Sequence, residues 1–153
     1  MTTMRSNGTW TVLIATEDAL LSRKWSLELQ DDCMVFSVAG RTELARGMAT
    51  HRPSILLLDR NLPGLSRVES LPAIQKLNRA TKILLFSKTP TANEGLAAIK
   101  AGARGYFPKN SPSHPLRKAV DMVQGGELWI GRNLVAHLLD ELALLRFQRP
   151  ETR

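Results

Sequence analysis

The feature that most constrains this chain is a repeated alternation of short apolar runs with segments of helical periodicity. These short, continuous apolar runs are typical of buried strands, and the first of them is also rich in β-branched residues. They occupy residues 10–15, 33–39, 54–59, 82–87 and 105–109. Apolar strands joined by helices imply a parallel sheet with helices on both faces. The expected fold class is therefore α/β, a three-layer, doubly wound, five-stranded parallel sheet.

Helical segments fill the gaps between these strands. Leu21, Trp25 and Leu29 recur every four residues, which predicts one buried helix face. Pro72 predicts that the third helix begins late, near Leu71, because proline fits only the first turn of a helix. The other helices are expected over residues 42–51, 91–102, 111–126 and 133–147.

Three local patterns add detail. Thr91 and Glu94 have the spacing of a capping box, in which each side chain caps the other residue's backbone N–H. Pro108 places the fifth strand at an edge of the sheet, because proline donates no ladder hydrogen bond. One face of the last helix carries a largely apolar stripe, which either docks on its own domain or forms a dimer. The stripe comprises Leu134, His137 or Leu138, Glu141 and Leu145.

Composition excludes several classes of protein. Cys33 is the only cysteine among 153 residues, which excludes an intrachain disulfide and a cysteine-based metal site. Aromatic residues make up 5% of the chain, which argues against a base-stacking surface. The net charge is +7, but the basic residues that produce it are scattered along the chain and form no long run. Neither a signal peptide nor a membrane-spanning stretch is apparent, which predicts a cytoplasmic protein without membrane contact.

Polar residues occur where the strands end. In a parallel sheet the carboxyl ends of the strands share one edge, and such folds place their chemistry there. That edge would bring together residues 16–18, Asp59, Ser87 and Lys109. The set contains carboxylates, a hydroxyl and an ammonium, and the chain has no glycine-rich phosphate loop.

This set of side chains suits phosphoryl transfer. Carboxylate oxygens with a backbone carbonyl are ligands that Mg²⁺ prefers, and the cation would neutralise charge on a transferring phosphoryl group. A carboxylate such as Asp59 can accept the phosphoryl group as an acyl phosphate. Lys109 would pair with a phosphoryl oxygen, and Ser87 would donate a hydrogen bond to another.

Four motifs, taken in order and spacing, resemble those of a known family. "VLIATED", "ILLLDRNLPG", "ILLFS" and "AGARGYFPK" resemble the receiver domain of bacterial two-component response regulators, over residues 11–139. The segment "AVDMVQGGELWIG" most resembles the subfamily with a C-terminal LuxR-type helix-turn-helix. The resemblance implies a flavodoxin-like fold with strand order 2-1-3-4-5 and an extra C-terminal helix.

The resemblance also implies roles for particular residues. Asp59 matches the phosphoacceptor, with Lys109 and Ser87 beside it. Glu17, Asp59 and the backbone carbonyl of Asn61 match the ligands of Mg²⁺. A sensor histidine kinase would supply the phosphoryl group, and the domain itself would not be an enzyme.

Two further regions match the family's switch and its output surface. Tyr106, together with Ser87, matches the pair that changes between the inactive and active states, although Tyr106 could equally serve packing. Residues 91–124 match the usual output face. A homodimer is therefore expected either through this face or through the C-terminal helix.

The chain departs from the family pattern at the acidic pair and after the lysine. Thr16 stands where the first acidic residue is usual, so Mg²⁺ should be held less tightly. Asp18 either substitutes for the missing acid or favours the start of the next helix through the helix dipole. Asn110 follows Lys109 where the family often has a cis proline, and a cis bond there would cost about 3 kcal/mol.

The chain is expected to have three parts. Residues 1–10 are predicted to be a disordered N-terminal segment, residues 11–131 the receiver domain, and residues 132–153 a linker helix with a basic tail. No helix-turn-helix follows in this sequence. Contact with DNA is therefore expected only through a C-terminal domain that this sequence lacks.

Two alternatives to a phosphorylated receiver stay open. The first is a degenerate receiver that acts by protein contact without phosphorylation, and Thr16 is its best support. The second is a phosphatase with an aspartate nucleophile, of the haloacid-dehalogenase kind. That class needs a second aspartate two residues after Asp59 as general acid, and Asn61 stands there instead. The phosphatase therefore ranks last.

Overall fold

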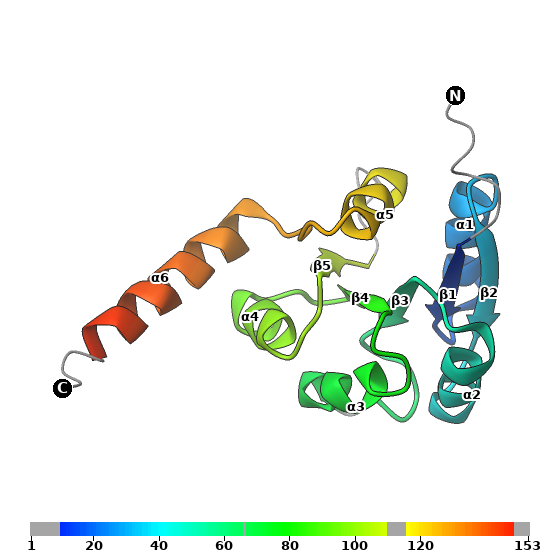
Figure 1. Cartoon of the computed structure of the whole chain (residues 1–153), viewed down its shortest axis with the longest axis horizontal. Helices are drawn as coiled ribbons and strands as arrows, with labels where there is room; N and C mark the ends of the chain where they lie inside the picture. Colours follow the sequence, from blue (N-terminus) through cyan, green and yellow to red (C-terminus); the bar gives the residue numbers. More distant parts are fainter. Residues whose placement is uncertain (1–9, 66, 110–115, 149–153) are drawn as a thin grey trace.

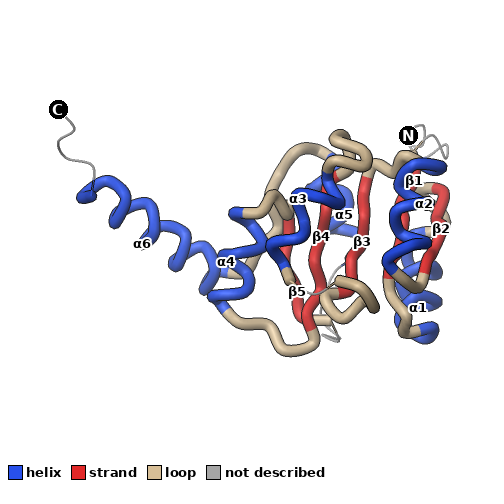
Figure 2. Tube along the Cα trace, turned by 90° about the horizontal axis from the view of Figure 1, so that it is seen from below, coloured by secondary structure: helices blue, strands red, loops and turns tan. Residues whose placement is uncertain are grey.

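A five-stranded parallel sheet forms the centre of the molecule (Figures 1 and 2). The computed structural model describes residues 10–65, 67–109 and 116–148. The strand order is β2-β1-β3-β4-β5, which confirms the predicted fold class and places the Pro108-containing strand at an edge. The strands are β1 Thr11–Ala15, β2 Met34–Val38, β3 Ile55–Asp59, β4 Lys82–Ser87 and β5 Gly105–Pro108.

Helices cover both faces of this sheet. They are α1 Ala19–Leu29, α2 Arg41–His51, α3 Leu71–Gln75, α4 Ala92–Lys100, α5 Leu116–Gln124 and α6 Arg132–Gln148. In Figure 1, α1 and α5 lie on one side of the strands, and α2, α3 and α4 lie on the other. A 3-10 turn, η2 Val68–Ser70, precedes α3, so the predicted late start at Leu71 is confirmed.

Two apolar layers hold the helices to the sheet. Successive residues of a strand point to opposite faces, so Leu13 lies in the apolar layer that α2, α3 and α4 cover, and Val12 lies in the layer that α1 and α5 cover. All five residues of β3 are buried, as expected for a central parallel strand. On the α1 side, the ring centroids of Trp25 and Phe86 are 4.4 Å apart. This packing fixes where β1, β3 and β4 end, and hence where the polar residues after them lie.

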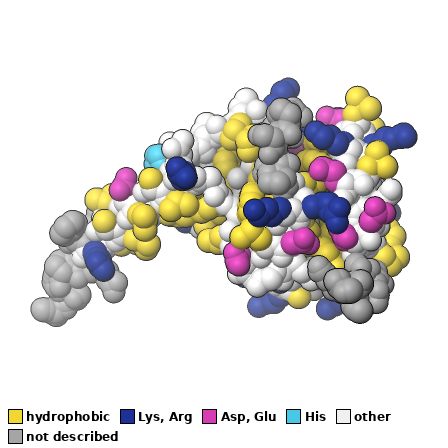
Figure 3. Space-filling view, turned by 90° about the horizontal axis from the view of Figure 1, so that it is seen from above, with side chains coloured by type: hydrophobic (Ala, Val, Ile, Leu, Met, Phe, Trp, Pro, Cys, Tyr) yellow, Lys and Arg dark blue, Asp and Glu magenta, His cyan; other side chains and the backbone are white. Residues whose placement is uncertain are grey.

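The last helix leaves the body of the protein. Its first turn packs on α4 through the buried Leu134, and Nζ of Lys100 lies 2.8 Å from Oε1 of Glu141. Beyond that ion pair, α6 projects away from the sheet (Figures 2 and 3). The predicted stripe is therefore split, because Leu134 is buried whereas Leu145 is 52% exposed.

Several sequence-based predictions fall wholly or partly outside the described residues. These are residues 1–9 of the predicted disordered segment 1–10, the peptide bond at Asn110, the first part of the fifth helix at 111–115 and the tail at 149–153. Trp10 is described, and its backbone carbonyl accepts a hydrogen bond from Met34. Within the described ranges, we find no helix with the length and apolar character needed to cross a membrane.

Candidate functional site

Asp59 lies at the carboxyl end of β3 and is almost completely buried, with 2% of its surface exposed. Its Oδ2 atom accepts a 2.6 Å hydrogen bond from Oγ1 of Thr16 and lies 2.9 Å from Nζ of Lys109. Its Oδ1 atom accepts a 2.8 Å hydrogen bond from the backbone N–H of Asn61. A buried carboxylate needs such donors, because an uncompensated charge is costly to bury. The structure thus brings together Asp59, Lys109 and the backbone of Asn61.

Thr16 takes part in this site directly. It is buried after β1, and its hydroxyl accepts the backbone N–H of Asp18 over 3.1 Å while donating to Asp59. A carboxylate at position 16 would instead place two like charges side by side. The threonine therefore supplies a hydrogen-bond donor to Asp59 without adding a charge of its own.

The two acidic residues after Thr16 point to different uses. Asp18 is the N-cap of α1, because its Oδ1 atom accepts the N–H of Leu21 over 3.1 Å. This geometry supports the helix-start interpretation of Asp18 over its use as a substitute acid. Glu17 is exposed to solvent. Among the described residues, no three His, Cys, Asp or Glu side chains form a group that could hold a metal ion.

A second polar cluster lies between α4 and β5. The hydroxyl of Tyr106 donates a 2.6 Å hydrogen bond to Oε1 of Glu94 and accepts the N–H of Thr91 over 3.0 Å. The other carboxylate oxygen of Glu94, Oε2, lies 2.9 Å from Nε of Arg60. Arg60 directly follows Asp59, so this cluster is joined by the chain to the first one.

The predicted capping box is only half correct. Thr91 is the N-cap of α4, and its side chain accepts the N–H of Glu94 over 3.1 Å. The return bond is missing, because the Glu94 carboxylate binds Arg60 and Tyr106 instead. The Tyr106 hydroxyl accepts the Thr91 N–H in its place. Glu94 thus connects α4 to β5 and to the residue after Asp59.

The surroundings of this cluster shift the pKa of both acidic groups. Burial acts to raise the pKa of Glu94, but hydrogen bonds from Tyr106, Ser87 and Arg60, with the charge of Arg60, outweigh it and lower the pKa. Burial, followed by the hydrogen bond to Glu94, raises the pKa of Tyr106 to about 12. At neutral pH the cluster therefore contains an ionised Glu94 and a protonated, donating Tyr106.

Ser87 is close to both clusters. It is the last residue of β4, is 1% exposed, and accepts the backbone N–H of Lys109 over 2.8 Å through its carbonyl. Its hydroxyl is one of the groups whose hydrogen bond lowers the pKa of Glu94. The structure therefore places Ser87 beside the predicted switch residue Tyr106 as well as at the strand edge that holds Asp59.

Comparison with known proteins identifies the domain. Residues 12–121 match the response regulator receiver domain family, which is most of the chain. This chain belongs to that family. Receiver domains are phosphoacceptor signalling modules rather than enzymes, and they typically bind Mg²⁺ at the site of phosphorylation.

Two curated relatives of this chain are named as regulatory proteins. The receiver is 31% identical over 134 residues to the oxygen regulatory protein NreC of Staphylococcus epidermidis, covering 85% of this chain and 62% of that protein. It is also 31% identical over 100 residues to the nitrate/nitrite response regulator protein NarL of Escherichia coli, covering 65% of this chain and 45% of NarL. The chain thus spans less than two thirds of the length of either relative.

Solved structures agree on the fold. A two-component response regulator of the LuxR family from Aurantimonas matches with a TM-score of 0.75 at 22% identity, covering 88% of this chain and 99% of that one. A CheY-like receiver domain protein from Methanospirillum hungatei matches with a TM-score of 0.65 at 21% identity, covering 76% and 94%. At this level of identity the likeness extends to the fold alone.

The residues expected to bind Mg²⁺ offer oxygen atoms, which are the ligands that this cation prefers. Glu17 and Asp59 are carboxylates, and the backbone carbonyl of Asn61 is a third oxygen ligand of the kind that Mg²⁺ prefers. Thr16 contributes a neutral hydroxyl that already donates to Asp59, and Asp18 is used as a cap. The set is therefore one carboxylate short of a receiver with both acids.

Two residues of the site were not predicted from sequence. Glu94 was assigned to the capping box, and Arg60 was given no role. The signal for Arg60 was its position directly after the candidate nucleophile Asp59, at the edge where loops from neighbouring strands meet. The signal for Glu94 was weaker, since its pairing with Tyr106 spans two elements and leaves no local spacing pattern.

Proposed function

We propose that this receiver is the signal-receiving module of a two-component transcription regulator, in which Asp59 accepts a phosphoryl group from a sensor histidine kinase. The observation that carries the proposal is the buried Asp59 carboxylate with Lys109 against Oδ2 at 2.9 Å. A cytoplasmic location and a phosphohistidine donor are part of the proposal. The name of the relative NarL, a nitrate/nitrite response regulator protein, supports a role in signalling.

The chemistry is a displacement at phosphorus. An oxygen of the Asp59 carboxylate attacks the phosphorus atom, and the bond from phosphorus to the donor's imidazole nitrogen breaks with its electron pair going to that nitrogen. The product is an acyl phosphate on Asp59 and a free histidine on the kinase. Lys109 would then pair with a phosphoryl oxygen, and the Ser87 hydroxyl would donate to another. The attacking group is a carboxylate oxygen, so no general base is needed.

Glu17, Asp59 and the backbone carbonyl of Asn61 are the groups that would hold Mg²⁺ in this proposal. When bound, the cation would supply positive charge against the incoming phosphoryl oxygens. Binding should be weak because Thr16 brings no charge to the set.

The test is chemical labelling of the purified chain. Incubation with acetyl phosphate and Mg²⁺ should add one phosphoryl group, seen by intact-mass spectrometry, and peptide mapping should place it on Asp59. The label should be lost in Asp59→Asn. Asp140→Asn, in the exposed part of α6, is the matched control and should label like the wild type. Label that persists in Asp59→Asn would overturn the assignment.

A degenerate receiver is the second candidate, and the Thr16–Asp59 hydrogen bond favours it. That bond and the Lys109 contact both engage Oδ2, so groups of the protein itself compensate the buried carboxylate. In this case the chain would signal by binding other proteins. The same labelling experiment separates the two candidates, since a degenerate receiver takes up no phosphoryl group from acetyl phosphate even at high Mg²⁺. A phosphatase would in addition turn over a phosphoester.

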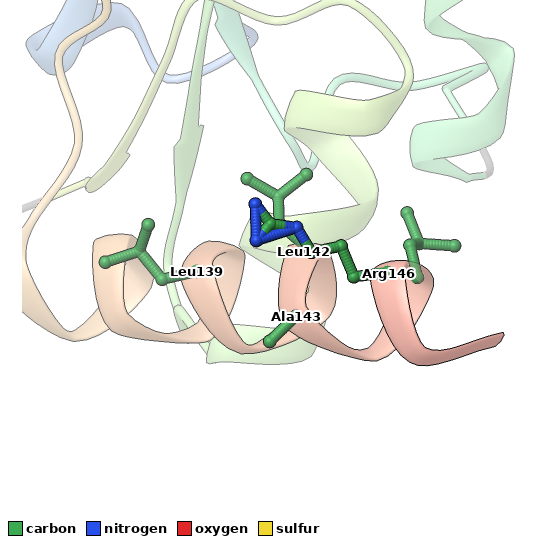
Figure 4. A pocket seen from close by; sticks show the side chains of 5 residues that line it. Leu139, Leu142, Ala143 and Arg146 are labelled. Atoms are coloured by element: carbon green, nitrogen blue, oxygen red, sulfur yellow. The ribbon is translucent and has the colours of Figure 1, made fainter. Parts of the chain in front are cut away.

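A homodimer is part of the proposal, through either the face formed by α4, β5 and α5 or the outer side of α6. The second surface is favoured by exposed apolar side chains on the projecting helix: Val135, Leu139, Leu142 and Leu145. Leu139 and Leu142 point to the same side of α6 and border a hollow there (Figure 4). DNA would be contacted only by a domain outside this sequence.

A further inference from the structure

Gly95 is the point on α4 where the switch tyrosine and the C-terminal helix meet. A Cβ atom built on Gly95 would lie 2.8 Å from Cδ2 of Tyr106 and 2.9 Å from Cδ2 of Leu134. The two side chains therefore fill the space that any larger residue at position 95 would need. Tyr106 and Leu134 also belong to the same buried apolar cluster. The position of the Tyr106 ring thus decides what Leu134 can pack against.

Leu134 is the main anchor of α6. It is 6% exposed, and within residues 132–146 no other side chain is buried to the same degree. The Lys100–Glu141 ion pair adds a second contact, but the two side chains are 59% and 37% exposed, and ion pairs that are open to solvent to this degree contribute little. Docking of the helix on α4 therefore depends chiefly on the contact over Gly95.

The inward position of Tyr106 depends in turn on Glu94. The 2.6 Å hydrogen bond from the Tyr106 hydroxyl ends on Oε1 of Glu94, and Arg60 holds Oε2 at 2.9 Å. A partly buried hydroxyl that loses such an acceptor is drawn toward solvent. A continuous series of contacts thus runs from the residue after Asp59 to the first turn of α6.

We propose that the hydrogen bond from Tyr106 to Glu94, called the latch below, holds Tyr106 in this position. We propose further that this latch controls the docking of α6 on α4. Arg60 and Glu94 act here as positioning residues. If Asp59 accepts a phosphoryl group, as proposed above, it gains a charge of about −1.5 to −2 one residue from Arg60, and this charge competes with Glu94 for the guanidinium. The phosphoryl oxygens compete with Glu94 for the Ser87 hydroxyl as well. The latch and α6 then change together, so that α6 reports the state of Asp59.

Hydrogen exchange of the full chain, followed by mass spectrometry without any phosphodonor, tests the latch itself. In Glu94→Ala the amides of residues 132–141 should exchange about tenfold faster than in the wild type, because a hydrogen bond to a charged acceptor is lost. Amides of β1 and β3 should be unchanged. Glu28→Ala, on α1 across the sheet, is the matched control and should leave α6 unaffected. Unchanged exchange of α6 in Glu94→Ala, or an equal increase in every element, would overturn the latch.

A milder variant covers the case in which Glu94→Ala does not fold. Glu94→Gln keeps the size and an acceptor oxygen but loses the charge that holds Arg60, so α6 should exchange about threefold faster. Wild-type rates in this variant, where Glu94→Ala is unfolded, would overturn the proposal.

A second arm separates this proposal from the phosphorylation of Asp59. Wild-type protein is treated with acetyl phosphate and Mg²⁺, its label is counted by intact mass, and exchange is measured again. Labelled protein should show at least a threefold change in α6, and labelled Glu94→Ala should show no further change. Full labelling with unchanged α6 would overturn the coupling to Asp59. Absence of label would contradict the proposed function instead, and the comparison without phosphodonor would then decide the latch alone.

Discussion

Oγ1 of Thr16 lies 2.6 Å from Oδ2 of Asp59 and donates its hydrogen bond to the same oxygen that Lys109 contacts at 2.9 Å. The carboxylate is therefore held by a neutral donor and an ammonium, where a receiver with two acids would place another negative charge. Like charges at this distance destabilise each other. Compared with an acidic residue at this position, Thr16 should therefore make the domain more stable without a bound cation, and it should make cation binding weaker.

Removal of the Thr16 hydroxyl should destabilise the domain. Thr16→Val keeps the shape of the side chain but leaves Asp59 with one donor fewer, and a hydrogen bond to a charged group is worth about 1.5–3 kcal/mol. The free energy of unfolding, measured by urea denaturation, should fall by that amount. Thr16→Ser keeps the donor and should lose less than about 1 kcal/mol. Equal losses in the two variants would show that the methyl group, and not the hydrogen bond, matters.

The Glu94 network predicts a defined pH dependence of stability. The pKa of Glu94 is lowered in the folded state by Tyr106, Ser87 and Arg60, although burial opposes the shift. Its contribution to stability is therefore complete above the usual carboxyl pKa of 4.5, and it is lost as the pH falls through the lowered folded-state pKa.

Urea denaturation of the wild type and Glu94→Gln across acidic pH checks this sign. The difference in unfolding free energy should be largest near neutral pH and should shrink as the pH falls below 4.5. Glu28→Gln, in α1, should show no such convergence. A difference that grows toward acid would mean that the folded state raises, rather than lowers, the pKa of Glu94.

A side chain at Gly95 should be unfavourable in spite of its position within a helix. Gly95→Ala gains about 1 kcal/mol from helix propensity. The new methyl group would meet the rigid Tyr106 ring at 2.8 Å, and overpacking of this kind costs about 1–3 kcal/mol. We expect a net loss of about 1 kcal/mol with faster exchange of α6. Gly131→Ala has open space around its Cβ and therefore no overpacking cost; because Gly131 is the residue before α6, only the smaller change at a helix N-cap is expected.

Prediction from sequence succeeded where burial alone decides the structure. The run ending at Asp59 is apolar without interruption, and only a central parallel strand buries such a run on both faces. The boundaries of Lys82–Ser87 were predicted to the residue. The strand ends then placed Asp59 and Lys109 at one edge, and no knowledge of their side-chain contacts was needed for that step.

Prediction failed where a polar side chain had a choice of partners. Thr91 and Glu94 fit a capping box locally, but the Glu94 carboxylate binds Arg60 and Tyr106, which are distant in sequence. A charged guanidinium and a phenol hydroxyl outcompete a backbone N–H for a carboxylate. Such a choice depends on how α4 sits against β5, and that geometry leaves no periodic signal in the sequence.

The exposed leucines of α6 predict an effect on self-association. If two copies pair through this surface, the double variant Leu139→Gln with Leu142→Gln should weaken the dimer about tenfold or more, as expected for apolar residues at the centre of an interface. Sedimentation at several concentrations measures this. Leu144→Gln is the control, because Leu144 is 54% exposed but lies two residues from Leu142 and so on another side of the helix. A wild-type chain that stays monomeric at high concentration would exclude an α6 dimer.

Restoring the missing acid should strengthen the cation site. Thr16→Asp adds a full negative charge beside Asp59, which should destabilise the metal-free protein by repulsion and tighten Mg²⁺ binding, because the cation relieves that repulsion. Changes around a metal site alter its affinity by about 10–100-fold. A Mg²⁺ titration followed by calorimetry or tryptophan fluorescence should show a gain in this range, and Mg²⁺ should restore the lost stability. Thr16→Asn introduces a side chain of the same size as Asp but without its charge, and this variant should bind Mg²⁺ like the wild type. Equal affinities for Thr16→Asp and wild type would mean that the site does not hold the cation, and the receiver would then act through protein contacts alone.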